Sequence, residues 1–199
     1  MFKAVVFDFG GVVRGIGHTG SRQMIAELYG LPLDQIGASI QKLAYQMSVG
    51  KITEAEFWTL LSESVGKPKP GEWKKLWHER TTKDFKINIP IVELVKNLKS
   101  QKIQCFVLSN TIPPHVEFNR AQGWYEMFDK VYLSVDIGLR KPDIKAYEYV
   151  LKDQDLKGEE CIYIDDLEEN LVPARELGMK TILAVDPDQV VKDVMAALN

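Results

Sequence analysis

The chain after Pro90 alternates short apolar runs with amphipathic helical patterns, and this alternation constrains the fold more than any other feature. The runs are nearly continuous in apolar residues, which is typical of strands buried on both faces. Strands that alternate with helices form parallel sheets covered by helices, so the pattern predicts an α/β fold. With one more run near the N-terminus, the predicted strands are 4–7, 102–108, 130–134, 161–164 and 180–184. The predicted helices after Pro90 are 91–100, 113–123, 143–152, 167–178 and 189–198.

A segment of almost wholly helical pattern, residues 15–85, follows the first predicted strand. Thr53 and Glu56 have the spacing of a capping box, which indicates the start of a helix. The segment leaves the carboxyl end of a strand, so we expect a helical lobe that covers this edge of the sheet. The flanking parts, 1–14 and 86–199, then form one core. Tryptophans at helical spacing should fill the lobe's interior; they are Trp58, Trp73 and Trp77.

The composition is that of an ordinary globular protein, with 199 residues, 45% of them hydrophobic, and a net charge of -3. No basic block suggests a nucleic-acid partner, and no apolar run approaches the length of a membrane span. The N-terminal run is broken by Asp8, which argues against a signal peptide. Cys105 and Cys161 fall inside predicted strands, so we expect buried free thiols and a cytoplasmic location. A monomer and a homodimer both remain open.

Polar residues stand at the carboxyl ends of the predicted strands, where ligands bind to open parallel sheets. Each group alone has a plainer explanation as a turn, a helix start or a solvated pair. Together, each at a strand end or shortly after one, they predict a single site at one edge of the sheet. These groups are Asp8 with Gly10 and Gly11, Ser109 with Asn110, Lys141 followed by Pro142, and Asp165 with Asp166.

The residue types at these ends fit phosphoryl transfer. Three carboxylates packed together raise one another's pKa, and a bound cation removes that difficulty. Oxygen ligands favour a hard ion such as Mg²⁺. Lys141 supplies a fixed positive charge, and Ser109 with the backbone amides after Asp8 can donate hydrogen bonds to phosphate oxygens. A carboxylate in such surroundings can attack phosphorus and form an aspartyl-phosphate.

Four motifs resemble those of the haloacid dehalogenase-like hydrolase superfamily: Phe7–Val12, Leu108–Asn110, Lys141–Asp143, and Ile164–Asp166 with Asn170. The resemblance implies a Rossmann-like parallel sheet core with an inserted four-helix cap, as in the branch of phosphoglycolate phosphatase and β-phosphoglucomutase. The stretch Gly50–Thr53 followed by Phe57 is most similar to the subgroup of bacterial glucose-1-phosphate phosphatase and the N-terminal phosphatase domain of soluble epoxide hydrolase.

The resemblance also implies a Mg²⁺ site. Asp8 matches the nucleophile, which is at the same time a metal ligand. The backbone carbonyl of Gly10 matches a second ligand, and Asp166 matches the direct metal carboxylate. Asp165 and Asn170 match positions that hold the metal's waters or the metal loop.

For the substrate, a small phosphorylated metabolite, the resemblance implies a cradle beside the nucleophile. Ser109 matches the group that binds the transferred phosphoryl group, with Asn110 beside it. Lys141 matches the lysine that pairs with both the phosphoryl group and the nucleophile. Gly11 and Gly10 offer backbone amides, and Lys51, in a turn of the inserted segment, is a candidate substrate contact.

One position departs from the pattern. Most phosphatases of the superfamily carry a second aspartate two residues after the nucleophile, which protonates the leaving group, and this chain has Gly10 there. General acid–base help is worth about two to four decades in rate. His18, after the first strand, is a candidate substitute, and sugar-1-phosphates or acyl phosphates need less help. Arg14, near the start of the insertion, could meet the substrate or anchor the lobe.

Three functions remain open on these residues. The leading one is a Mg²⁺-dependent phosphatase for a small phosphorylated metabolite, with a sugar phosphate as one candidate substrate. A 2-haloacid dehalogenase is the second, although the paired Asp165 and Asp166 argue against it because that chemistry needs no metal. The third is a weakly active or non-catalytic protein that binds a phosphorylated ligand, which Gly10 favours and the otherwise intact set of site residues opposes.

Overall fold

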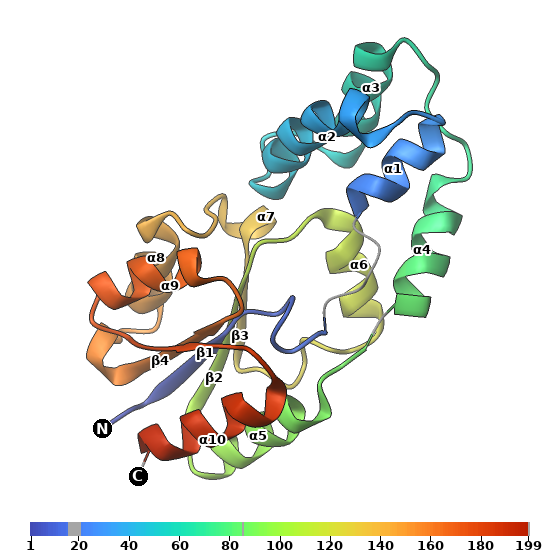
Figure 1. Ribbon diagram of the computed structural model, residues 1–199. Helices are drawn as coiled ribbons and strands as arrows, with labels where there is room; N and C mark the ends of the chain where they lie inside the picture. The colour runs from blue at the N-terminus through green and yellow to red at the C-terminus, as the bar shows by residue number, and fades with distance from the viewer. Residues whose placement is uncertain (16–20, 85, 199) are drawn as a thin grey trace.

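The protein has two lobes, an α/β core and a helical lobe above it, in a computed structural model that describes residues 1–15, 21–84 and 86–198 (Figure 1). The core holds a parallel sheet with strand order β3-β2-β1-β4-β5, which confirms the predicted Rossmann-like α/β fold. Its strands are β1 (Ala4–Phe7), β2 (Gln104–Ser109), β3 (Lys130–Leu133), β4 (Cys161–Asp165) and β5 (Lys180–Leu183).

The central strand β1 is buried on both sides because helices cover both faces of the sheet. Its residues alternate between two hydrophobic clusters, with Val5 and Phe7 in one and Ala4 and Val6 in the other. On the first face lie α5 (Ile89–Ser100) and α10 (Pro187–Leu198), and on the second lie α8 (Ile144–Asp153) and α9 (Glu168–Glu176). The remaining core elements are α6 (Pro113–Ala121), α7 (Ser134–Ile137) and the short 3-10 helix η1 (Gly158–Glu160).

The helical lobe has a hydrophobic cluster of its own. Trp58 and Trp73 are buried there, with ring centroids 4.8 Å apart, as the sequence predicts. The side chain of Trp77 lies outside the described part of the structure. Thr53 and Glu56 form the expected capping box. The helices of the lobe are α1 (Ser21–Tyr29), α2 (Leu33–Ser48), α3 (Glu54–Val65) and α4 (Trp73–Asp84).

The two chain crossings between the lobes run side by side. Gly15 N donates to Lys86 O at 2.8 Å, and Asn88 N donates to Val13 O at 2.9 Å. The Asn88 side chain adds a hydrogen bond of 2.6 Å to the carbonyl of Val12. These bonds tie the start and the end of the insertion into one two-stranded hinge.

The structure departs from the predicted elements in small ways. Helix α7 was not predicted, because it follows β3 directly and its apolar residues keep the period-two spacing of a strand. Strand β2 begins at Gln104, since Lys102 has a φ of 63° and belongs to the preceding turn. Cys105 and Cys161 are free and buried, as expected. Among the helices of the described residues, none is both long and apolar enough to cross a membrane.

Candidate active site

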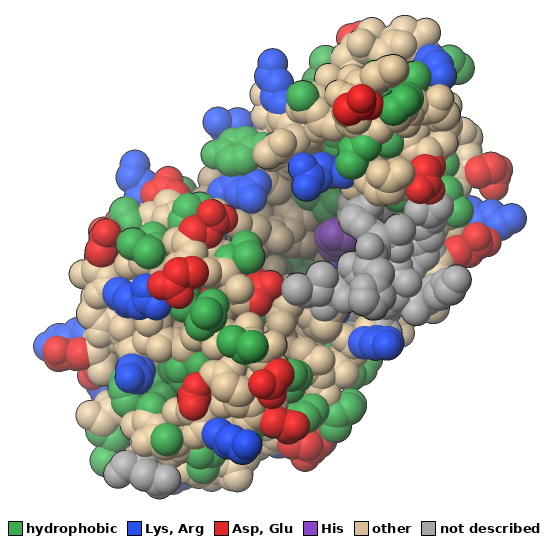
Figure 2. Space-filling view, in the orientation of Figure 1, with side chains coloured by type: hydrophobic (Ala, Val, Ile, Leu, Met, Phe, Trp, Pro, Cys, Tyr) green, Lys and Arg blue, Asp and Glu red, His purple; other side chains and the backbone are tan. Residues whose placement is uncertain are grey.

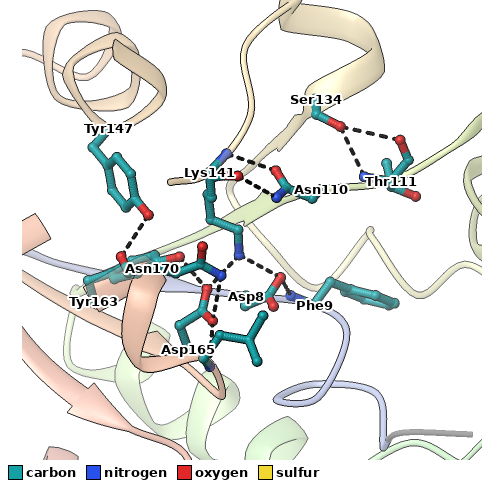
Figure 3. Close-up of polar contacts among 11 residues, drawn as sticks. Asp8, Phe9, Asn110, Thr111, Ser134, Lys141, Tyr147, Tyr163, Asp165 and Asn170 are labelled. Atoms are coloured by element: carbon teal, nitrogen blue, oxygen red, sulfur yellow. Dashed lines mark hydrogen bonds and ion pairs between the residues drawn. The ribbon is translucent and has the colours of Figure 1, made fainter. Parts of the chain in front are cut away.

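Asp8 follows β1 and Asp165 ends β4, and Lys141 lies between them at the centre of the sheet edge (Figure 3). The ammonium nitrogen of Lys141 lies 2.9 Å from Asp8 Oδ1 and 2.6 Å from Asp165 Oδ2. Only 1% of Lys141 is exposed, so its charge must be balanced by these carboxylates rather than by water. Residues from distant strand ends thus lie together at one edge of the sheet, as the sequence predicts.

Asn110 fixes the position of Lys141 through its backbone. The Asn110 Nδ2 donates to the carbonyl of Lys141 at 2.8 Å, and its Oδ1 accepts from the Lys141 amide at 2.9 Å. Both polar atoms of the side chain are thus used on the loop that carries the lysine. This positioning contact between β2 and the loop was not predicted from the sequence, where Asn110 was expected at the substrate.

Asp165 accepts hydrogen bonds at both carboxylate oxygens. Its Oδ1 accepts from the backbone amide of Leu167 and from Asn170 Nδ2, each at 2.9 Å. Its Oδ2 accepts from Lys141 and, at 2.5 Å, from the hydroxyl of Tyr163. A carboxylate held in this way on a fully buried strand end orients the lysine and the loop that follows β4.

The three carboxylates of the site form a group that can hold a cation. Asp8, Asp165 and Asp166 each offer an oxygen, and these atoms lie within 4.8 Å of one another. Burial raises the pKa of Asp8 to about 6, against the lowering effect of Lys141, and Asp165 raises it further. Burial, and then the charge of Asp165, also raises the pKa of Asp166. A hard divalent cation would offset this cost, so the donor set fits Mg²⁺.

Gly11 makes room for one of these carboxylates. A Cβ atom at this position would lie 2.3 Å from both Cγ and Oδ2 of Asp166, and the backbone has a φ of +91°. The glycine is thus required both by its conformation and by the close approach of Asp166. At Gly10 a Cβ would meet nothing within 4 Å, so the position of the missing aspartate is open space.

The remaining expected residues lie around this centre. Ser109 is buried as the last residue of β2, two residues beyond the pairing of Val107 with Phe7, which places it beside the end of β1. Lys51 is exposed and lines a cavity of about 480 Å³ that Lys141 also lines. Arg14 is half-buried in the hinge. His18 lies outside the described residues.

Several residues of the cleft between the lobes were missed by the sequence analysis. A second cavity, of about 350 Å³, is lined by Tyr45 of the helical lobe and by His115 of α6. Burial, with the nearby charge of Arg14, lowers the pKa of His115 to about 3, so this imidazole is neutral at pH 7. Arg140 lines both cavities. Figure 2 shows the hollow, with Lys and Arg side chains at its rim.

The motifs at the strand ends are thus assembled into one site. Residues 2–178 match the haloacid dehalogenase-like hydrolases. The protein belongs to this family. The resemblance drawn from the motifs is confirmed, and so is the expectation that the chain is a hydrolase.

The relatives of this hydrolase include several phosphatases. A sesquiterpene phosphatase of Aspergillus oryzae is 29% identical over 89% of this chain and 87% of its own length. A D-ribitol-5-phosphate phosphatase of Bacteroides thetaiotaomicron is 25% identical over 91% of each chain. The bifunctional epoxide hydrolase 2 of Sus scrofa is 26% identical over 96% of this chain, which spans 38% of that protein.

A solved structure extends the comparison to three dimensions. An enzyme of the same family from Bacteroides thetaiotaomicron, in complex with magnesium and inorganic phosphate, superposes with a TM-score of 0.74. It is 26% identical to this chain, and the match covers 92% of this chain and 94% of the other. This related enzyme therefore holds the same ion that the carboxylates of this chain fit.

Proposed function

We propose that this hydrolase is a Mg²⁺-dependent phosphatase for a small phosphorylated metabolite. The observation that carries the proposal is the contact of Lys141 with both Asp8 and Asp165, beside a third carboxylate, Asp166. A nucleophile, a fixed cation and a cation-binding group thus share one buried edge of the sheet. The phosphatase relatives and the magnesium and phosphate complex of the related enzyme support this choice.

We assign the nucleophile to Asp8. The two hydrogen-bond and ion-pair contacts of its side chain with the described residues both use Oδ1, which accepts from the backbone amide of Phe9 at 2.6 Å and from Lys141 at 2.9 Å. We infer that Oδ2 attacks the phosphorus, so that an O–P bond forms, the ester P–O bond breaks and the leaving oxygen takes a proton. Water then hydrolyses the aspartyl-phosphate and returns the free carboxylate.

The surrounding residues stabilise the negative charge of the transferred group. Lys141 donates to a phosphoryl oxygen while Asp165 and Asn110 keep it in place, and Ser109 donates from the end of β2. Asp8, Asp166 and the carbonyl of Gly10 would hold Mg²⁺, which neutralises charge on the phosphoryl oxygens when bound. Both carboxylate oxygens of Asp165 accept hydrogen bonds from protein donors, so we propose that Asp165 positions Lys141 and does not bind the metal directly.

We propose that residues 15–85 form a cap domain and that 1–14 with 86–199 form the core. The separate hydrophobic cluster of the helical lobe and the paired hinge segments support this division. The cap covers the cleft in which Asn110 and Lys141 line a cavity. Closure there excludes water from the transfer and lets the cap contribute to the choice of substrate.

The open space at Gly10 bears on the leaving group. His115 is neutral at pH 7 and cannot serve as an imidazolium acid. We therefore propose that the substrates have leaving groups that need little protonation, such as sugar-1-phosphates or acyl phosphates, or that His18 supplies the proton. Unchanged turnover in a His18→Ala variant would exclude His18 as the proton donor.

Hydrolysis of p-nitrophenyl phosphate tests the proposal, because this substrate needs little acid help. We expect Mg²⁺-dependent release of nitrophenol that EDTA abolishes and that Asp8→Asn lowers by at least a thousandfold. Asp188→Asn, which changes an exposed carboxylate of α10, is the matched control and should retain the activity. Equal rates for Asp8→Asn and the parent protein, or no effect of EDTA, would refute the proposal.

A further inference from the structure

Arg140 crosses the cleft from the core to the helical lobe, directly before Lys141 in the chain. Its Nη1 donates to the hydroxyl of Ser48 at 2.9 Å. The guanidinium carbon lies 4.9 Å from the centroid of the Tyr45 ring, so the planar group stacks on an aromatic face. Both partners belong to α2. The side chain is thus held in one place, and the described residues use only part of its donor capacity.

The charge of Arg140 has no acidic partner among the described residues, although the side chain is half-buried. The cavity of about 350 Å³ that it lines holds a second arginine, Arg22 of α1, and its lining includes no acidic residue of the described ranges. Of the two cavities that Arg140 lines, only the larger has acidic residues in its described lining. There Asp143 and Glu169 are exposed, and Asp143 caps α8 by accepting from the Lys145 amide. The smaller cavity is therefore a cationic chamber.

We propose that Arg140, with Arg22 across the chamber, binds a second anionic group of the substrate. The substrate would be a phosphate ester that also carries a carboxylate or another phosphate group. This inference rests on the proposed phosphatase function and adds the class of substrate. The guanidinium offers a fixed fork of donors that matches a carboxylate or phosphate edge, and its stacked position is already ordered before binding.

The position of Arg140 in the chain connects the two ends of such a substrate. The neighbouring residue Lys141 faces the nucleophile, while Asn110 lines both cavities and binds the backbone of Lys141. A compact substrate can therefore reach both the catalytic carboxylates and the chamber. A neutral or apolar group in the chamber would leave the arginine desolvated without an anion, which selects against such substrates.

Matched pairs of substrates test the inference. Glucuronic acid 1-phosphate and glucose 1-phosphate differ only by a carboxylate in place of a hydroxymethyl group. Glucose 1,6-bisphosphate and glucose 1-phosphate differ by a second phosphate. All three are sugar-1-phosphates, whose leaving groups need little protonation. In at least one pair, we expect the parent protein to have a kcat/KM at least tenfold higher for the substrate that carries the second anionic group. The pair that shows the preference tells whether the chamber takes a carboxylate or a phosphate.

Variants then assign the preference to the arginine. Arg140→Gln should lower the ratio of kcat/KM within the pair at least tenfold, and Arg140→Lys should restore it in part. Lys42→Gln, an exposed cation on the same helix as Tyr45, is the control and should keep the ratio. Ser48→Ala removes the hydrogen bond between the lobes but keeps the charge, so it should keep the ratio as well.

Three results would overturn the inference: no preference within either pair, an unchanged ratio in Arg140→Gln, or the same loss in Ser48→Ala as in Arg140→Gln. The last result would make the arginine a latch between the lobes. p-Nitrophenyl phosphate separates this inference from the proposed function. Aryl phosphate hydrolysis without any preference within the pairs refutes only the second anion site, whereas no Asp8-dependent hydrolysis of any substrate refutes the phosphatase and the inference with it.

Discussion

Replacing Gly11 with alanine should weaken Mg²⁺ binding, because the added methyl group would displace the carboxylate of Asp166, a proposed metal ligand. The added Cβ would lie 2.3 Å from Cγ and 2.7 Å from Oδ1 of Asp166. Carbon and oxygen atoms in ordinary contact are about 3.5 Å apart, so the carboxylate must move by roughly 1 Å. Loss of support around a metal typically costs about 10–100-fold in affinity, and here a proposed ligand itself shifts.

Calorimetric titration of the protein with Mg²⁺ measures this effect. We expect the Kd of Gly11→Ala to rise at least tenfold, with a parallel loss of Mg²⁺-dependent hydrolysis. Gly10→Ala should bind Mg²⁺ as the parent does, because a Cβ there meets nothing within 4 Å. Gly10 and Gly11 thus form a matched pair, because an added Cβ would clash with Asp166 at Gly11 and with nothing at Gly10.

Backbone strain is a separate consequence of the same substitution. The φ of +91° at Gly11 is unfavourable for alanine and should cost about 1–2 kcal/mol of stability. Gly66 isolates this effect, because its φ is +64° and a Cβ added there would meet no atom within 4 Å. Gly66→Ala should lose stability without any change in Mg²⁺ affinity. Gly11→Ala with the parent's Kd would refute the assignment of Asp166 as a ligand.

Three further substitutions or conditions have defined outcomes. Because Asp8 has a pKa of about 6 and binds Mg²⁺ only when ionised, lowering the pH from 7 to 5 should weaken Mg²⁺ binding about tenfold, measured by the same titration. The raised pKa also means that the metal-free protein gains stability as the pH falls through 6, and a loss would contradict it. Asn110→Ala should lower kcat at least tenfold by freeing Lys141, while the Kd for Mg²⁺ stays constant; a changed Kd with a constant kcat would exclude this positioning role. Thr53→Ala should lower the free energy of unfolding in urea by about 1 kcal/mol, whereas Thr59→Ala, inside the same helix, should not.

The sheet and its functional edge could be predicted because both follow from local patterns. Runs such as the one before Asp8 are apolar without alternation, and a topological rule then gathers their carboxyl ends. Helix α7 was not predicted because Leu133, Val135 and Ile137 keep the period-two spacing of a strand, and no glycine or proline separates α7 from β3. Strand boundaries shifted where a single residue, Lys102, adopts a left-handed conformation.

Contacts between distant side chains were beyond the reach of the sequence. Arg140 directly precedes the motif Lys141–Asp143, yet nothing in the sequence shows that the Lys141 side chain turns toward Asp8 and the Arg140 side chain toward the helical lobe. Gly11 was expected to offer an amide to the phosphate group, and its closeness to Asp166 depends on how β1 and β4 pair. Such contacts depend on where the fold places both partners.

The paired hinge segments have a consequence for how this architecture can change. Because Val13 and Asn88 are hydrogen-bonded to each other, contacts within the core already hold the two ends of the inserted lobe together. A short turn could join them, and the chain entropy of closing a longer segment grows only slowly with its length. The core can therefore carry inserted lobes of different size and lining at this point. On the proposed function, another lobe grafted between these two residues would change the choice of substrate and leave the residues at the sheet edge in place.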